Sequence, residues 1–167
     1  ATAIKGVYAS VFYAQSKAYM VATSNVIDQE KMAVILQQVV GRNYSDRFYP
    51  TFSGVGRSLN YYPIGDETAE EGTVSLAMGL GKYIVDGGLT LRVCPYHPTK
   101  VLQTSELDIA LRDTQTQFYA LDMKNTGESF SVNDGFNLLK IRVQDAEKDG
   151  SLDQLASTFD PYDQVLL

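Results

Sequence analysis

Two glycines separated by one residue are the feature of this sequence best suited to chemistry. Gly79-Leu80-Gly81 follows the apolar run Thr73–Met78, and Lys82–Asp86 is expected to form one or two helical turns after it. Glycine lets the backbone approach a ligand, and free amides at such a turn can meet a phosphate. The pattern lacks the third glycine of a dinucleotide fingerprint and the ending of a P-loop. Two interpretations stay open: a nucleotide contact, or a turn that needs a positive φ.

The sequence contains one cysteine, Cys94, and one histidine, His97. These numbers exclude an internal disulfide, a zinc ribbon and a metal site built from two or three histidines. A Cys and a His three residues apart at a strand end do not form a catalytic pair. We therefore expect Cys94 to be a small buried hydrophobe and His97 to lie in a turn or at the surface.

Charged side chains in the last third of the chain offer little chemistry. Asp145, Glu147 and Asp149 stand in a charge run that is typical of a solvated face rather than a metal site. Arg112 and Asp113 are adjacent and are expected to form a structural ion pair. No self-sufficient active site follows, so we predict no catalytic and no metal-binding residue.

The composition indicates one acidic globular domain over residues 1–167. The chain is 44% hydrophobic and 20% charged, and 14 basic against 20 acidic residues give a net charge of −6. An acidic surface repels a phosphate backbone, so no nucleic-acid partner is predicted. No apolar run approaches the roughly 20 residues that cross a bilayer, so no membrane partner is predicted either.

The ends of the chain and its cysteine usage suggest where the protein works. The lack of a secretory signal and of a disulfide framework predicts a cytoplasmic location. The chain begins without Met and ends in Val165-Leu166-Leu167, an apolar run. We interpret it as an internal fragment of a larger, multidomain enzyme.

Apolar spacing predicts one long helix over residues 2–22 that packs one face on a core. Its stripe consists of Ile4, Val7, Tyr8, Val11, Phe12, Ala18 and Tyr19. The apolar run within residues 32–40 ends at a glycine and is typical of a strand buried on both faces.

Further strands are expected in the rest of the chain, with a break or sheet edge at Pro50. They cover residues 48–60, 73–78, 89–96, 116–123, 138–143 and 155–159. Residues 145–149 predict a charged turn or short helix. One long helix with six or seven strands makes α+β the fold class.

Four segments, taken in order, resemble the nucleotide-binding domain of phosphoenolpyruvate synthase and pyruvate, phosphate dikinase. They are Ala3–Phe12, similar to a helix pattern of the family; Met32–Val40, similar to its strand ending Gln-x-Met-Val; Phe52–Ser58, similar to its Ser-Gly-Val strand; and Ser75–Gly88, similar to its Gly-Leu-Gly segment. Each match is modest, but four in order are specific. Residues 1–100 resemble the family core, and residues 101–167 a variant-specific extension.

The resemblance implies an ATP-grasp-like lobe with a mostly antiparallel sheet and few helices besides the first. In this family ATP phosphorylates a histidine on a separate domain, with Mg²⁺ neutralising charge. That phosphohistidine passes its phosphoryl group to pyruvate in a barrel domain. ATP, pyruvate and water thus give phosphoenolpyruvate, AMP and phosphate. The implied cofactors are ATP and Mg²⁺, and the implied partners are pyruvate and the phosphohistidine and barrel domains of the same chain.

The resemblance also assigns nucleotide contacts to eight residues, namely Gln38, Val39, Val40, Gly54, Val55, Gly79, Gly81 and Lys82. The first three would form the strand edge that meets the adenine, and the next two would lie beside them in the paired strand. The two later glycines would approach the ribose or the phosphates. Lys82 replaces the family's acidic residue; it would meet a phosphate as a point charge or lie on a solvated helix.

Several family motifs have no counterpart in this sequence, among them the Arg-Ser-Ser phosphate clamp, and His97 does not stand in the phospho-carrier context. We expect this fragment to be inert alone. The leading hypothesis is a piece of a phosphoenolpyruvate synthase. Two alternatives are a dikinase with another acceptor, such as a glucan or an antibiotic, and a non-catalytic module for nucleotide sensing or interdomain contact. An exposed apolar cleft face also predicts a homodimer.

Overall fold

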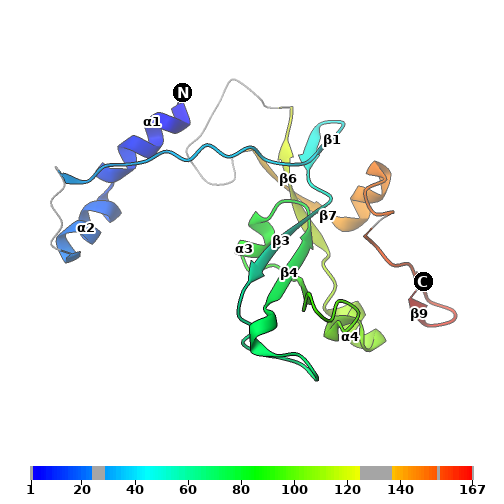
Figure 1. The fold of residues 1–167 in the computed structure, drawn as a ribbon. Helices are drawn as coiled ribbons and strands as arrows, with labels where there is room; N and C mark the ends of the chain where they lie inside the picture. Colours follow the sequence, from blue (N-terminus) through cyan, green and yellow to red (C-terminus); the bar gives the residue numbers. More distant parts are fainter. Residues whose placement is uncertain (1, 24–28, 125–136, 154, 167) are drawn as a thin grey trace. The chain divides into compact units, whose positions relative to one another are not determined.

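The computed structural model describes residues 2–23, 29–124, 137–153 and 155–166. The chain divides into two compact units, one formed by residues 1–39 and 127–136, the other by residues 40–126 and 137–167. The described helices are short and the strand pairs are antiparallel (Figure 1). The prediction of an α+β fold with mostly antiparallel sheets, as in an ATP-grasp-like lobe, is confirmed. None of the described helices could cross a bilayer.

The first unit begins with a broken helical run. α1 spans Thr2–Ala9, the 3₁₀ helix η1 spans Ser10–Phe12, and α2 spans Ala14–Thr23. The single long helix expected over residues 2–22 is thus interrupted at Tyr13, whose backbone is extended (φ −68°, ψ 151°). The Ser16 hydroxyl donates to the Ser10 carbonyl oxygen at 2.7 Å and ties the two helical pieces together.

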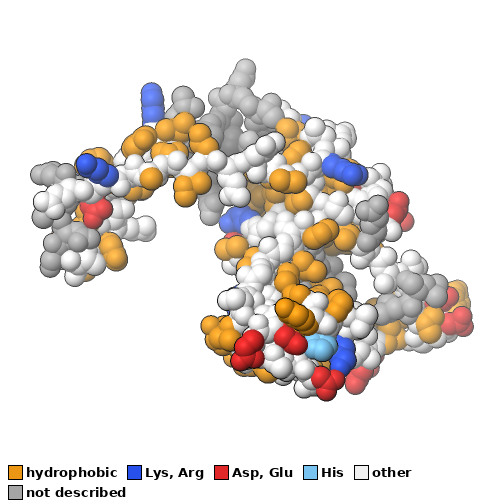
Figure 2. All heavy atoms as spheres, viewed as in Figure 1, with side chains coloured by type: hydrophobic (Ala, Val, Ile, Leu, Met, Phe, Trp, Pro, Cys, Tyr) orange, Lys and Arg blue, Asp and Glu red, His pale blue; other side chains and the backbone are white. Residues whose placement is uncertain are grey.

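The described helices of this unit bury few side chains. Val11 and Met20 are buried, but Tyr8, Phe12 and Tyr19 are 54%, 62% and 67% exposed. Figure 2 shows hydrophobic side chains on the surface of these helices. The expectation that the aromatic stripe faces a core is therefore wrong. Helical spacing gathers apolar side chains on one face, but it does not supply the layer that would cover that face.

Residues 32–40 form no strand, although a buried strand was predicted there. The side chains of Ile35, Leu36 and Val40 are 79–89% exposed. A strand needs a neighbour that satisfies its backbone hydrogen bonds, and none of the strands in the described part of the chain pairs with this segment. The prediction is wrong because hydrophobicity indicates burial but does not identify a pairing partner.

The second unit contains two antiparallel sheets and a short ribbon. The four-stranded sheet has the order β1 (Arg42–Tyr44), β2 (Arg47–Tyr49), β6 (Gln117–Asp122) and β7 (Leu138–Arg142). The three-stranded sheet has the order β3 (Phe52–Arg57), β4 (Thr73–Met78) and β5 (Leu91–Val93). β8 (Phe159–Asp160) pairs with β9 (Val165–Leu166).

Short helices connect these strands. They are η3 (Ala69–Glu71), α3 (Lys82–Val85), η4 (Leu102–Thr104), α4 (Leu107–Arg112) and η5 (Val143–Asp149). The predicted strands at residues 73–78, 116–123 and 138–143 are confirmed, as are the turns of α3. The strand expected over residues 48–60 is divided into β2 and β3 at Pro50, which has no N–H to donate to a ladder. Of the strand expected at 155–159, only Phe159 pairs.

The hydrophobic core of the second unit is centred on Tyr49. Its ring stacks on Tyr44 with centroids 4.3 Å apart and packs against Phe118 at 4.8 Å. Its hydroxyl donates to Asp149 Oδ2 at 2.7 Å and lies 3.0 Å from Ser151 Oγ. Burial raises the pKa of this phenol above its ordinary value. The prediction that Asp149 is a solvated charge is therefore wrong, because its side chain is only 8% exposed and accepts the hydrogen bond of the core tyrosine.

One side chain joins the two sheets. The Gln115 carboxamide accepts a hydrogen bond from Met78 N at 2.8 Å and donates to Met78 O at 3.1 Å. It also donates to Gln117 O at 2.8 Å. Gln115 thus satisfies both backbone groups at the end of β4 and links them to the start of β6, much as a neighbouring strand would.

A buried polar cluster fixes the loop between β3 and β4. Glu67 Oε2 accepts hydrogen bonds from Arg92 Nη2 at 2.8 Å, from Asn60 Nδ2 at 2.9 Å and from Ile64 N at 3.1 Å. Asn60 Oδ1 accepts from Tyr62 N and from Arg92. The Arg92 guanidinium, despite the opposing effect of burial, holds the pKa of Glu67 at about 2. The loop is thus held by charge-assisted hydrogen bonds.

We predict that Gln115→Ala destabilises the chain by about 2 kcal/mol, because it leaves both backbone groups of Met78 without their partner. Urea denaturation measures this free energy. Gln144→Ala, on the exposed surface of η5, is the matched control and should change it by less than about 0.5 kcal/mol. Equal losses in the two variants would contradict the role of Gln115 as the link between the sheets.

We predict that Glu67→Gln removes an acid-sensitive part of the stability. The folded pKa of Glu67, about 2, lies below its unfolded value of 4.5. The carboxylate therefore stabilises the fold fully above pH 4.5, and this contribution is lost as the pH falls from 4.5 towards 2. Urea midpoints at pH 7 and pH 3 should show the variant and the unmodified chain converging at the lower pH. Glu70→Gln, at an exposed position of η3, should leave the pH dependence unchanged. A constant difference between Glu67→Gln and the unmodified chain at both pH values would refute the prediction.

Candidate functional site

The pairing of β3 with β4 gathers most of the predicted site residues. Gly54 lies opposite Leu76, and Val55 lies opposite Ser75. The Gly79-Leu80-Gly81 turn follows β4 directly, and Ser53 on β3 donates its hydroxyl to the Gly79 carbonyl oxygen at 2.7 Å. Figure 1 shows β3 and β4 side by side with α3 next to them. The end of this strand pair is therefore the candidate site.

Gly79 is required by the backbone and by packing. Its φ is +81°, in the region that favours glycine. A Cβ at this position would lie 2.6 Å from Phe118 Cδ2 and 2.7 Å from the Tyr119 carbonyl oxygen. That oxygen accepts a hydrogen bond from Leu80 N at 2.9 Å. Of the two interpretations of the Gly-Leu-Gly turn, a structural requirement for positive φ therefore accounts for its first glycine.

Gly81 is different, because neither reason applies to it. Its φ is −58°, which any residue can adopt, and it is the N-cap of α3. The nearest atom to a Cβ built at this position is Ser53 Cβ, at an ordinary van der Waals distance of 3.6 Å. The fold therefore tolerates a side chain here, and the glycine leaves the backbone of this turn open to a close approach.

Lys82 opens α3 and is engaged within its own helix. Its ammonium group donates to Asp86 Oδ1 at 3.2 Å, an i,i+4 ion pair. Tyr83, the next residue, is buried, and its ring meets the ring of Tyr119 edge-on with centroids 5.9 Å apart. This contact positions α3 against β6. The ion pair favours the interpretation of Lys82 as a helix-surface residue over that of a phosphate ligand.

The three residues predicted to meet the adenine do not belong to β3, β4 or α3. Gln38 and Val39 belong to the first unit and Val40 to the second, and all three are exposed outside any strand. The structure therefore brings together Gly54, Val55 and the Gly79–Lys82 turn. The adenine contacts of those three residues stay a prediction.

The sequence reasoning missed three residues that hold the candidate site in place. Ser53 binds the Gly79 carbonyl, Gln115 binds both backbone groups of Met78, and Phe118 packs under Gly79. Ser53 lies in the Phe52–Ser58 segment, from which the sequence predicted only Gly54 and Val55 as site residues. Gln115 and Phe118 carry no local signal, since their partners lie far away along the chain.

Cys94 and His97 share a carboxylate and build no catalytic pair. Cys94 is fully buried, as expected, and its thiol donates to Glu71 Oε2 at 3.6 Å. His97 lies in a turn, with Nε2 3.4 Å from the same oxygen. The pKa of Glu71 is lowered from its ordinary value. The hydrogen bond from the Thr68 N–H is the largest cause, and His97 and Cys94 lower it further.

Acidic side chains do not converge on a metal position in the described ranges of the chain. No group of three or more His, Cys, Asp or Glu side chains among these residues could hold an ion. Asp145 pairs with Arg142 at 3.0 Å, and Asp113 pairs with Arg112 at 2.9 Å, as expected for a structural ion pair. The described residues thus contain no preformed cluster of protein ligands for an ion.

The chain matches the family model of the pyruvate phosphate dikinase AMP/ATP-binding domain over residues 1–147. The chain belongs to this family. The comparisons with curated proteins and with solved structures found no match. The family match covers β3, β4 and α3, and it extends beyond the four segments that carried the resemblance.

Membership in the pyruvate phosphate dikinase family identifies the nucleotide and the class of chemistry. The chain is an ATP-binding part of a dikinase-type phosphotransferase. This agrees with the family expected from the Gly-Leu-Gly turn and the Ser-Gly-Val strand. The expected homodimer stays a prediction.

Proposed function

We propose that the chain supplies part of the ATP site of a phosphoenolpyruvate synthase, which converts ATP, pyruvate and water to phosphoenolpyruvate, AMP and phosphate. The pyruvate phosphate dikinase family match supports the use of ATP. The order of the Ser-Gly-Val and Gly-Leu-Gly segments supports the nucleotide-binding domain that the synthase shares with pyruvate, phosphate dikinase. In this proposal the phosphoryl group passes through a histidine on another domain of the same enzyme, which works in the cytoplasm.

The observation that carries the proposal is the open backbone at Gly81. Gly79 is explained by its φ and by Phe118, whereas Gly81 has no structural need to be glycine. A glycine without a structural reason fits a backbone that a ligand approaches closely. In this role Gly81 would face the ribose or phosphate side of ATP. Gly79 and Ser53 would hold the Gly79-Leu80-Gly81 turn in position.

The other site residues follow the same scheme. Residues 38–40 would line the adenine with backbone groups and apolar side chains, as is usual for sites that bind planar rings. Gly54 and Val55 would lie beside them on β3. Lys82 would stay on the helix surface with Asp86. No step is assigned to Mg²⁺, because the described residues contain no preformed cluster of ion ligands.

A second candidate function is a non-catalytic module that binds a nucleotide without transferring its phosphate. The Lys82–Asp86 ion pair favours it, because the family's acidic residue at this position is replaced by a cation that is already engaged. A dikinase that phosphorylates an acceptor other than pyruvate would use the same lobe. The three possibilities differ in their reaction products.

We predict that Gly81→Ala weakens ATP binding about tenfold, or about 1.4 kcal/mol, while the chain folds at least as stably as before. A Cβ fits the backbone there, and replacing glycine at a compatible position stabilises by roughly 0.5 kcal/mol. Calorimetric titration with ATP and urea denaturation measure the two effects. Gly79→Ala is the opposite control and should destabilise the fold. Unchanged ATP affinity in Gly81→Ala would refute the approach of ATP to this turn.

We predict that the enzyme containing this chain forms AMP and phosphoenolpyruvate from ATP only when pyruvate is present. Both products can be followed by ³¹P NMR over time. AMP formed only with another acceptor would keep the nucleotide site and reject pyruvate. No turnover with any acceptor, together with measurable ATP binding, would instead support the non-catalytic module.

A further inference from the structure

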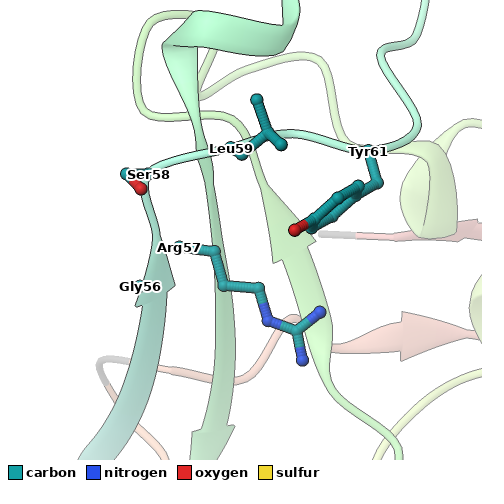
Figure 3. Close-up of a pocket in the computed structure, with 5 residues that line it drawn as sticks. All are labelled: Gly56, Arg57, Ser58, Leu59 and Tyr61. Atoms are coloured by element: carbon teal, nitrogen blue, oxygen red, sulfur yellow. The ribbon is translucent and has the colours of Figure 1, made fainter.

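An open hollow lies at the opposite end of β3 from the Gly-Leu-Gly turn. Because β3 and β4 are antiparallel, Phe52 pairs with Met78 near the turn while Arg57 pairs with Thr73 at the far end. The hollow has a volume of about 430 Å³ and is lined by Gly56, Arg57, Ser58, Leu59 and Tyr61. Figure 3 shows the Arg57 side chain and the Tyr61 ring pointing into it from two sides. Its lining contains one cation and no carboxylate.

Arg57 is a cation that meets no carboxylate in the described part of the chain. Among the described residues, it takes part in no ion pair or side-chain hydrogen bond, whereas Arg47, Arg92 and Arg142 each meet a carboxylate. Arg57 and Val55 lie two residues apart on β3 and so point to the same face of the sheet. Val55 pairs with Ser75, and Ser75 pairs with Arg92, so Arg92 lies on that face too. Glu67 neutralises Arg92 at 2.8 Å. The positive charge left on this face is therefore that of Arg57.

The loop that carries Tyr61 is held in place before any ligand arrives. Asn60, its neighbour on one side, is buried; its N–H donates to the Ala69 carbonyl at 2.8 Å, and its side chain bonds Glu67. On the other side, the Tyr62 carbonyl accepts a hydrogen bond from Arg92 at 3.1 Å. Tyr61 is itself 66% exposed. Because the backbone is already fixed, binding at Tyr61 does not require the loop to become ordered.

From these observations we propose that the Arg57–Tyr61 hollow binds a small organic phosphate monoester. The guanidinium presents paired N–H donors that match a phosphate, and the Tyr61 hydroxyl adds a donor from the facing side. The hollow is larger than a bare phosphate and lies within the roughly 300–1,000 Å³ range of small-molecule sites. The Tyr61 ring and Leu59 give the organic part of the ligand an apolar wall. The site is separate from the proposed ATP site and does not depend on it.

Phenyl phosphate is the probe, since it carries a phosphate and one planar ring and has no adenosine. Calorimetric titration into the chain should detect its binding, with inorganic phosphate weaker and phenol weaker still. Arg57→Gln should reduce the affinity for phenyl phosphate at least about tenfold. The affinity of Arg57→Lys for phenyl phosphate should lie between those of the unmodified chain and Arg57→Gln, because lysine keeps the charge and loses the planar guanidinium. Circular dichroism should show that both variants fold, since the side chain is exposed.

Arg42→Gln is the matched control, because Arg42 is an exposed strand residue and its loss changes the net charge equally. It should leave the affinity for phenyl phosphate within about twofold of the unmodified chain. An equal loss in Arg42→Gln and Arg57→Gln would overturn the proposal, since it indicates diffuse charge attraction. So would unchanged binding in Arg57→Gln, or phenol binding as tightly as phenyl phosphate. Inorganic phosphate binding as tightly as phenyl phosphate would overturn the assignment to an organic ligand.

Discussion

The second unit depends on one carboxamide. Gln115 satisfies both backbone groups of Met78 with a single side chain and also reaches Gln117 O, so it joins the last residue of β4 to the first residue of β6. Asparagine is one methylene too short to offer the same reach, and an apolar side chain would leave two peptide groups unpaired. Unpaired buried backbone groups are costly. The position of the turn after β4 is therefore set by a residue 37 positions away.

This link imposes the close approach that decides the first glycine of the turn. With β4 held against β6, Gly79 lies on Phe118, and Leu80 N donates to the Tyr119 carbonyl. Ser53 fixes the turn from β3. Three strands thus meet at one peptide, where no Cβ has room. Gly81 lies just beyond this crowded point, and its glycine cannot be explained by packing. The same short motif thus contains one glycine that the fold needs and one that it does not.

The strand β4, the turn and α3 could be predicted from the sequence because their signals are local. An apolar run, two glycines and a short helical segment follow one another without interruption. Residues 32–40 show the limit of that reasoning, since their hydrophobicity predicted burial and they are exposed. Gln115 and Phe118 could not be found for a related reason. Both residues act through contacts with residues far away along the chain. Those contacts form only in the folded structure, so neighbouring residues in the sequence do not indicate them.

The two arginines on one face of the β3–β4–β5 sheet show how the fold uses charge in an acidic chain. Arg92 is neutralised by Glu67, and this ion pair, with Asn60, fixes the loop that returns to β4. A buried carboxylate that must hold a loop cannot also serve a neighbouring cation. Arg57, close by in the register, pairs with no carboxylate among the residues that the structure describes. The interaction that stabilises the loop is therefore the reason that the end of β3 keeps a positive charge facing solvent.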